Sequence, residues 1–225
     1  MENGTRSELL GRLAAAVGSV ANAHPTRVAV DGPPAAGKTT LADELALVLR
    51  AQGRDVIRAT IEDFLTPRSQ RYRRGEDSAE GCYHDSFDFD AMHKALLDPL
   101  GPGGDRRFRQ AVYDKVTDTP RSEPIVTAPA DAVLLFDGVF LMRPELIDRW
   151  DLRIFVSAPF ENTLDRARTR DQTPSRSATE VERRYRSRYI PSQQFYFDTV
   201  RPTDQADIVV HNDDPHHPAW EAQPH

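Results

Sequence analysis

The stretch of the chain with the clearest chemical meaning is "GPPAAGKT", from Gly32 to Thr39. It matches G-x-x-x-x-G-K-[ST], the loop in which backbone N–H groups surround phosphates and a lysine adds positive charge. The apolar run 27–31 precedes it directly, and the helical pattern "KTTLADELALVLR" begins at its end. A phosphate-binding loop joins a strand to a helix in this way, so the context favours nucleotide binding over a structural turn.

The residue types within this loop suggest a role for each member. Lys38 is placed to reach the β- and γ-phosphates, and the Thr39 hydroxyl is placed to coordinate Mg²⁺. Pro33 and Pro34 have no N–H, so the amides of residues 35–40 are expected to hold the phosphates. The guanine-reading motif N-K-x-D is absent from the sequence, so ATP is the expected donor. The predicted nucleotide-binding residues are Gly32, Pro33, Pro34, Ala35, Ala36, Gly37, Lys38, Thr39 and Thr40.

A second apolar run, "AVLLFD", ends in an acid at Asp137. An acid at a strand end often serves as a turn or cap. Beside a phosphate-binding loop, however, it is typical of the Walker-B acid that holds the Mg²⁺ shell next to the loop threonine. The sequence therefore predicts a metal site that includes Thr39 and Asp137.

Two arginines follow the fourth apolar run, in "TLDRARTRD". Arg166 and Arg170 are four residues apart, which places them on one face of a helix. They could close over the phosphates and balance charge on the transferring group. The alternative is a solvated basic helix; the phosphate-binding loop earlier in the chain favours the catalytic interpretation.

Two adjacent acids end the run 56–61, in "TIEDFLTPR". Glu62 and Asp63 are both candidates for a general base. Side chains alternate along a strand, so only one of the two should face the phosphates if the extended geometry continues to this point.

These side chains need a scaffold, and five apolar runs indicate one. The runs are "RVAVD" (27–31), "DVIRATI" (55–61), "AVLLFD" (132–137), "LRIFVS" (152–157) and "ADIVVH" (206–211). Helical patterns and polar loops between them predict a parallel sheet covered on both faces. The segment 64–123 is too long for a simple crossover and is predicted to form an acceptor-binding insertion, with a helix around "DFDAMHKALLDPL".

Length, charge and cysteine content limit the class of protein. The 225 residues suit a single domain, in which 163–190 form a lid and 213–225 a flexible tail. The net charge of −6 argues against binding to nucleic acids or anionic membranes. A lone Cys82 indicates a reducing compartment and a cytoplasmic protein. The N-terminal residues form an amphipathic pattern with Ser7 as the expected N-cap, and resemble neither a signal peptide nor a membrane span.

Taken together, the motifs resemble those of the uridine kinase and phosphoribulokinase family of P-loop kinases, over residues 27–212. The resemblance is carried by "VDGPPAAGKTT", "IEDF", "YHDSFDFDAM", "AVYD", "VLLFDGVFLM", "LRIFVSAPFENTLDRARTRD" and "ADIVVHND". It implies a P-loop NTPase α/β fold of three layers, with a five-stranded parallel sheet in the order 2-3-1-4-5 and an arginine lid. It also implies ATP-dependent phosphorylation of a small-molecule hydroxyl; a homo-oligomer is one open option.

The resemblance also implies roles for single residues. Family members have a carboxylate two positions before an aromatic residue, which accepts the acceptor's proton and lies near the metal; aligned on Phe64, that position is Glu62, where the family usually has aspartate. Nucleoside-phosphorylating members have a histidine shortly after a Tyr-Asp pair, whereas this chain has Asp118 there. The acceptor-binding residues implied are Asp85, His84, Tyr113 and Asp114. Arg68 is added as a candidate from the arginine-rich stretch described next, not from the resemblance.

The acceptor is the least determined part of the prediction. A nucleoside such as uridine or cytidine is the first choice, and a sugar, sugar phosphate or vitamin-like alcohol is the alternative. The cluster Arg68, Arg71, Arg73 and Arg74 would suit an anionic acceptor, or it forms a solvated loop neutralised by nearby acids. A different class, an ATP-dependent switch or assembly factor, would need neither the insertion nor the acid in "IEDF".

Overall fold

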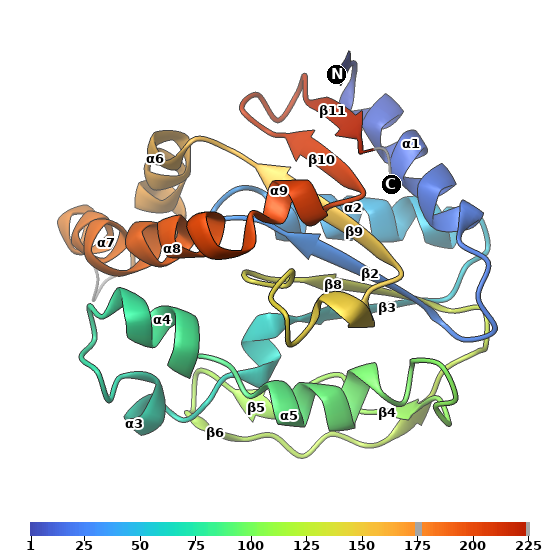
Figure 1. Cartoon of the computed structure of the whole chain (residues 1–225), viewed down its shortest axis with the longest axis horizontal. Coiled ribbons are helices and arrows are strands. Elements are labelled where there is room, and N and C mark those ends of the chain that lie inside the picture. The colour runs from blue at the N-terminus through green and yellow to red at the C-terminus, as the bar shows by residue number, and fades with distance from the viewer. Residues whose placement is uncertain (174–176, 224–225) are drawn as a thin grey trace.

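A computed structural model describes residues 1–173 and 177–223 of the chain. At its centre lies a seven-stranded sheet in the order β1-β11-β10-β9-β2-β8-β3 (Figure 1). Five of these strands are parallel, with the bounds β2 (Thr26–Asp31), β3 (Val56–Thr60), β8 (Val133–Asp137), β9 (Leu152–Ser157) and β10 (Ile208–His211). Numbered along the chain, these five strands lie in the order 2-3-1-4-5. The mixed α/β fold with a mostly parallel sheet is therefore confirmed.

Two antiparallel strands extend the sheet beyond the five that the sequence predicts. β11 (Ala219–Ala222) pairs with β10, and β1 (Glu2–Asn3) pairs with β11. The prediction of a flexible tail over 213–225 is wrong for β11, because Trp220 is 5% exposed and packs into the main core. One aromatic side chain among prolines and histidines gave no periodicity from which this strand could be recognised.

Helices cover both faces of the sheet, as the apolar runs predict. α1 (Arg6–Ser19) and α2 (Lys38–Ala51) pack with Val28, Val30 and other residues of one face. On the other face, Leu134 and Phe136 of β8 pack against the insertion. The N-cap of α1 is Thr5, not Ser7: the Thr5 hydroxyl accepts from the Glu8 amide while the Glu8 carboxylate accepts from the Thr5 amide. This reciprocal pair satisfies two free donors at the helix start.

The insertion after β3 is built from short elements. These are η1 (Ile61–Phe64), α3 (Arg68–Arg71), α4 (Ala79–Asp85), α5 (Phe89–Met92), η2 (His93–Leu97), β4 (Arg107–Phe108), β5 (Tyr113–Asp114), β6 (Thr119–Pro120) and β7 (Val126–Thr127). Met92, Leu96 and Leu97 are fully buried against the sheet, so the helix predicted around "DFDAMHKALLDPL" is present and anchors the insertion. A 3₁₀ turn, η3 (Ile147–Arg149), follows β8.

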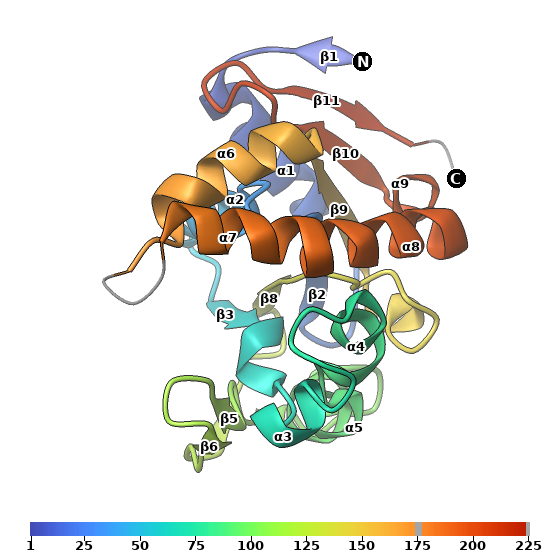
Figure 2. The same ribbon diagram turned by 90° about the vertical axis from the view of Figure 1, so that its left-hand side faces the viewer.

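The C-terminal helices cross the open side of the molecule. α6 (Phe160–Arg170) precedes α7 (Ala178–Arg184), which continues through a π-helical segment, η4 (Tyr185–Tyr189), into α8 (Ile190–Val200). Figure 2 shows α7 and α8 as one continuous rod that passes between α6 and α4; α9 (Pro202–Gln205) then leads to β10. The predicted lid, 163–190, contains residues 174–176, which lie outside the described residues. No helix in the described ranges is long and apolar enough to cross a membrane.

Candidate active site

A cleft of about 1170 Å³ opens where the parallel strands end. Thr60 and Val30 both register with Asp137 across the sheet, so the loops after β2, β3 and β8 begin at one edge. The cleft is lined by the phosphate-binding loop, η1, parts of the insertion and residues of α6, η4 and α8. Ligands of open parallel sheets bind at this edge.

The backbone of the phosphate-binding loop is compact and requires its glycines. Gly32 has φ +147°, and a Cβ there would lie 2.2 Å from the Val156 carbonyl oxygen. Gly37, the residue before α2, has φ +99°, and a Cβ there would lie 2.5 Å from Nδ2 of Asn212. That amide donates to the Ala36 carbonyl at 2.7 Å, so Asn212 fixes the backbone of the loop through a buried hydrogen bond.

Lys38 is buried at the start of α2. Its Nζ donates to the Pro33 carbonyl at 2.6 Å, which keeps the ammonium inside the loop. Burial lowers the pKa of Lys38 to about 8, against the opposing effect of the carboxylates of Asp31, Asp137 and Glu62. The free amides at the helix N-terminus and this cation together form a site for phosphate oxygens.

Thr39 and Asp137 meet as the sequence predicts. The Thr39 hydroxyl donates to Oδ2 of Asp137 at 2.6 Å. The other carboxylate oxygen, Oδ1, accepts from Nη2 of Arg58 on β3 at 2.8 Å. A hydroxyl and a carboxylate oxygen side by side fit the oxygen-ligand preference of Mg²⁺.

Both acids of "IEDF" line the cleft, whereas alternation along a strand predicted that only one of them would face the phosphates. The extended geometry ends at Thr60, and residues 61–64 form the 3₁₀ turn η1, so strand alternation does not separate the two side chains. Glu62 forms an ion pair with Lys115, and its negative charge acts to raise the pKa of both Lys38 and Arg170. Burial raises the pKa of Asp63, and the neighbouring charges that act on this pKa include those of Arg121 and Glu123. Of the two acids, Glu62 is therefore the one whose negative charge raises the pKa of Lys38 in the phosphate-binding loop.

The two arginines of α6 have different surroundings. Arg170 lines the cleft and pairs with Asp171 at 2.6 Å. Arg166 is absent from the cleft lining, because its Nη2 donates to the carbonyls of Asn212 and Asp213 at 2.7 and 3.0 Å. In this conformation only Arg170 is placed to face a nucleotide, while Arg166 supports the segment that holds Ala36.

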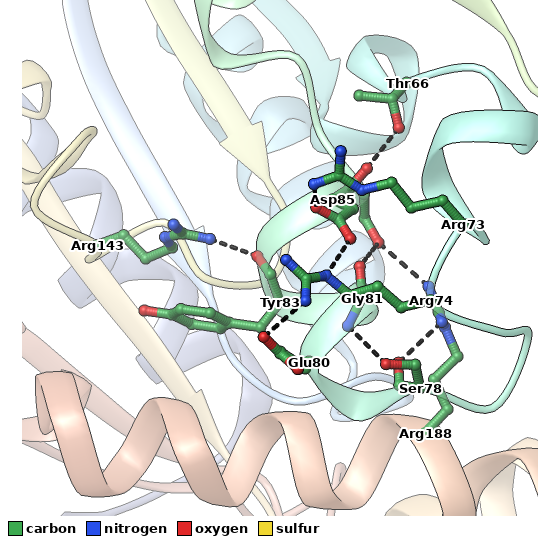
Figure 3. Close-up of polar contacts among 11 residues, drawn as sticks. Thr66, Arg73, Arg74, Ser78, Glu80, Gly81, Tyr83, Asp85, Arg143 and Arg188 are labelled. Atoms are coloured by element: carbon green, nitrogen blue, oxygen red, sulfur yellow. Dashed lines mark hydrogen bonds and ion pairs between the residues drawn. The ribbon is translucent and has the colours of Figure 1, made fainter.

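The predicted acceptor-binding residues are less closely grouped. Asp85 is 5% exposed and lies between Arg73 and Arg74, with N–O distances of 2.7 and 2.8 Å (Figure 3). His84, on the same helix, is exposed and stacks edge-on against Tyr83. Neither Asp85 nor His84 lines the cleft in this conformation.

The remaining acceptor residues belong to the β5–β6 hairpin and α3. The Tyr113 hydroxyl donates to Asp118 at 2.9 Å, and Asp114 accepts from the amides of Val116 and Thr117 in the hairpin turn. Arg68 lines the cleft, and its amide donates to Asp118. Asp118, at the position where nucleoside kinases carry histidine, is therefore a structural acceptor here.

Asp31 is a functional candidate that sequence reasoning missed. It is fully buried and accepts from the Gly32 and Leu141 amides at 2.7 and 3.0 Å and from the Tyr196 hydroxyl at 2.6 Å. It thereby joins the phosphate-binding loop, the loop after Asp137 and α8. Burial raises its pKa to about 6. Its signal was an acid closing an apolar run, the same signal that identified Asp137.

Removing the Tyr196 hydroxyl tests this junction. The hydroxyl also accepts from the Met142 amide at 2.9 Å, so Tyr196→Phe removes two hydrogen bonds in a buried region. We expect the free energy of unfolding to fall by about 1–3 kcal/mol, measured by urea denaturation. An unchanged midpoint would show that the three remaining backbone donors satisfy Asp31 alone.

Comparison with known proteins agrees with this geometry. The model of the cytidylate kinase-like family matches residues 27–214. Uridine-cytidine kinase B of Dictyostelium discoideum is 27% identical over 190 residues, which cover 83% of this chain and 74% of that protein. The uridine kinase of Mycoplasma pneumoniae is 26% identical over 184 residues, covering 81% of this chain and 83% of that protein.

Solved structures show the same fold. A possible uridine kinase from Bacillus stearothermophilus superposes with a TM-score of 0.71 at 22% identity, covering 90% of this chain and 97% of that one. D-glycerate 3-kinase from Cryptococcus neoformans superposes with a TM-score of 0.61 at 15% identity, covering 97% and 99%. The family match extends from β2 to beyond β10 and so includes the phosphate-binding loop, Asp137 and Arg170. The chain belongs to the cytidylate kinase-like family, and the resemblance to uridine kinases inferred from its motifs is confirmed.

Proposed function

We propose that the chain is a kinase that transfers the γ-phosphoryl group of ATP to a hydroxyl of a small molecule, first of all a nucleoside such as uridine or cytidine. One observation carries the proposal: Lys38, the Thr39–Asp137 pair, Glu62 and Arg170 line a single cleft. The named activities of the relatives from Dictyostelium discoideum and Mycoplasma pneumoniae support a nucleoside acceptor. The use of ATP supports a cytoplasmic location.

Each side chain has one task in the proposed reaction. Lys38 and the amides of residues 35–40 bind the phosphates, and Arg170 balances charge on the transferring group. The acceptor oxygen forms a bond to Pγ, the bond from Pγ to the β,γ-bridging oxygen breaks, and ADP leaves with that electron pair. Glu62 takes the proton of the hydroxyl.

Mg²⁺ belongs to the proposal as well. Thr39 and Asp137 would hold it, with Glu62 nearby, since their oxygens already converge beside the loop. When bound, the ion neutralises charge on the β- and γ-phosphates.

The lowered pKa of Lys38 predicts that ATP binding weakens in alkaline solution. Phosphate oxygens favour the charged ammonium, and the free protein loses this charge as the pH rises through about 8. The dissociation constant of ATP should therefore rise about tenfold between pH 7.5 and pH 9. Calorimetric titrations at the two pH values measure the change. In Lys38→Ala, ATP binding should be weak and nearly independent of pH in this range; an equal pH effect in that variant would contradict the assignment.

The acceptor panel tests the function itself. ATP turnover is measured alone and with pools of nucleosides, sugars, sugar phosphates and vitamin-like alcohols, and the product is identified by mass spectrometry. Strong stimulation by one pool supports a kinase. Slow turnover that no pool stimulates would favour an ATP-dependent switch instead.

A further inference from the structure

Three arginines surround one aromatic ring at the side of the cleft formed by α3, the end of α7 and η4. The guanidinium carbons of Arg71, Arg184 and Arg188 lie 5.4, 5.3 and 4.9 Å from the ring centroid of Tyr72. All four side chains, here called the arginine–tyrosine cluster, line the cleft. They come from segments more than a hundred residues apart, so only the fold brings them together.

The cluster has a deficit of negative charge. Arg188 is 2% exposed, yet its hydrogen bonds go to the neutral carbonyls of Glu76 and Ser78, at 3.2 and 2.9 Å, and to the Ser86 hydroxyl. Figure 3 shows the contact with Ser78. Arg184 donates to the hydroxyls of Tyr72 and Tyr189. Among the described residues, the one ion pair of the cluster joins Arg71 to Asp118 at 3.4 Å.

Buried cations are normally paired with anions, because neutral hydrogen-bond acceptors leave the charge itself uncompensated. Three other cations of the cleft already have anionic partners: Arg58 pairs with Asp137, Lys115 with Glu62, and Arg170 with Asp171. Arg68 also lines the cleft, and only its backbone amide contacts an acid, Asp118. ATP would compensate Lys38. The cluster, together with Arg68 on the same helix α3 as Arg71, is therefore the part of the cleft whose charge the protein and ATP leave unbalanced.

The position of the cluster indicates which ligand supplies the missing charge. Lys38 is bonded to the Pro33 carbonyl within the phosphate-binding loop, whereas the cluster is bonded to Glu76, Ser78 and Asp118 of the insertion. The cleft volume of about 1170 Å³ also exceeds the roughly 300–1,000 Å³ of single-ligand sites, so it has room for a second ligand beside ATP.

We infer that the acceptors of this kinase include, beside neutral nucleosides, alcohols that also carry a phosphate or carboxylate group, and that Arg71, Arg184 and Arg188 bind that group. The inference rests on the proposed function and concerns its acceptor. The anionic group itself does not react; it fixes the orientation in which the hydroxyl meets Pγ. Arginine suits this task because its planar fork matches both carboxylate and phosphate oxygens.

Matched acceptor pairs provide the first test. Uridine is compared with uridine 3′-monophosphate, and glycerol with glycerate, in the presence of Mg²⁺ and ATP. We expect the charged member of at least one pair to show a kcat/KM at least about tenfold higher, the effect of one charge-assisted contact. Binding of the same pairs in the presence of ADP, measured by calorimetry, should show the same preference whether or not transfer occurs.

Variants of neighbouring arginines provide the second test. Arg184→Gln should raise the KM and the dissociation constant of the charged acceptor about tenfold, with little change in the KM of ATP. Arg184→Lys keeps the positive charge but lacks the planar guanidinium group. Its KM and dissociation constant for the charged acceptor should lie between those of the unaltered protein and those of Arg184→Gln. The matched control is Arg183→Gln, since Arg183 is exposed, pairs with Glu180 and Asp77, and is outside the cleft. Thermal unfolding of each variant checks the fold.

The outcomes separate this inference from the proposed function. Equal turnover and equal binding of neutral and charged partners would overturn the inference and leave the kinase assignment in place. A rise in the KM of ATP instead of the acceptor would assign the cluster to the nucleotide and also overturn it. If no alcohol is phosphorylated but the charged partners still bind more tightly through Arg184, the subsite stands and the proposed kinase function fails.

Discussion

Replacing Lys38 with alanine is expected to lower kcat/KM by about 10³-fold, because the ammonium is the cation inside the phosphate-binding loop. It is held there by the Pro33 carbonyl and is buried beside Asp31 and Asp137. Alanine keeps the helix that begins at this residue, so the loss should reflect the missing charge. Steady-state rates with saturating acceptor and varied ATP measure the effect.

The control for this variant is Lys94→Ala. Lys94 is exposed in η2, outside the cleft, so its removal should leave kcat/KM within about twofold of the unaltered protein, since isolated surface changes have small effects. A Lys38→Ala variant with near-normal activity would mean that phosphates do not bind in the loop, and the proposed reaction would have to be abandoned.

The sequence was sufficient to predict the parallel sheet and the phosphate-binding loop, because each of these elements can be recognised from consecutive residues. Each parallel strand coincides with a mainly apolar run; β2 and β8 are buried throughout, while the edge strand β3 is mostly half-buried. The loop motif and the acid at the end of β8 lie on adjacent strands, so Thr39 and Asp137 had to be neighbours once the sheet order was known. Strand periodicity and motif spacing therefore account for the nucleotide side of the cleft.

The other side of the cleft depends on contacts between distant segments. Arg58 is one basic residue within a strand, and nothing in its local sequence indicates that it would bind Asp137. Asn212 reaches Ala36 across 176 positions of sequence. The prediction that Arg166 faces the phosphates follows from helical spacing alone, which cannot show that Asn212 and Asp213 offer carbonyl oxygens on the same face.

The acceptor site illustrates the same limit. The four-arginine cluster of the sequence separates in the fold: Arg73 and Arg74 neutralise Asp85, while Arg71 joins Arg184 and Arg188 around Tyr72. The amino-acid composition correctly indicated a positively charged segment in the insertion. It could not show which of the arginines have an acid as partner, because that depends on how α4 and η4 pack together.

Replacing Glu62 with glutamine is expected to lower kcat by about 10²–10⁴-fold, the usual contribution of a positioned general base. Glutamine has nearly the same shape but cannot take the hydroxyl proton. The substitution also removes the ion pair between Glu62 and Lys115. Because Lys115 is exposed on the β5–β6 hairpin, this ion pair contributes little to stability. ATP binding should persist, because the loop amides and Lys38 are unchanged. The pair of measurements is therefore a single-turnover rate and an ATP dissociation constant.

Asp63→Asn is the matched comparison, since both acids belong to η1 and line the same cleft. The pKa of Asp63 is affected by the charges of Arg121 and Glu123, whereas Glu62 affects the pKa of Lys38. The Asp63→Asn variant should therefore retain most of the turnover. A Glu62→Asp variant adds a finer test: it restores the residue type that related kinases usually carry but withdraws the carboxylate by one methylene. If the backbone of η1 is set for glutamate, this variant should recover only part of the rate. Full activity in Glu62→Gln together with a loss in Asp63→Asn would transfer the base to Asp63, and full activity in both would mean that neither carboxylate removes the proton.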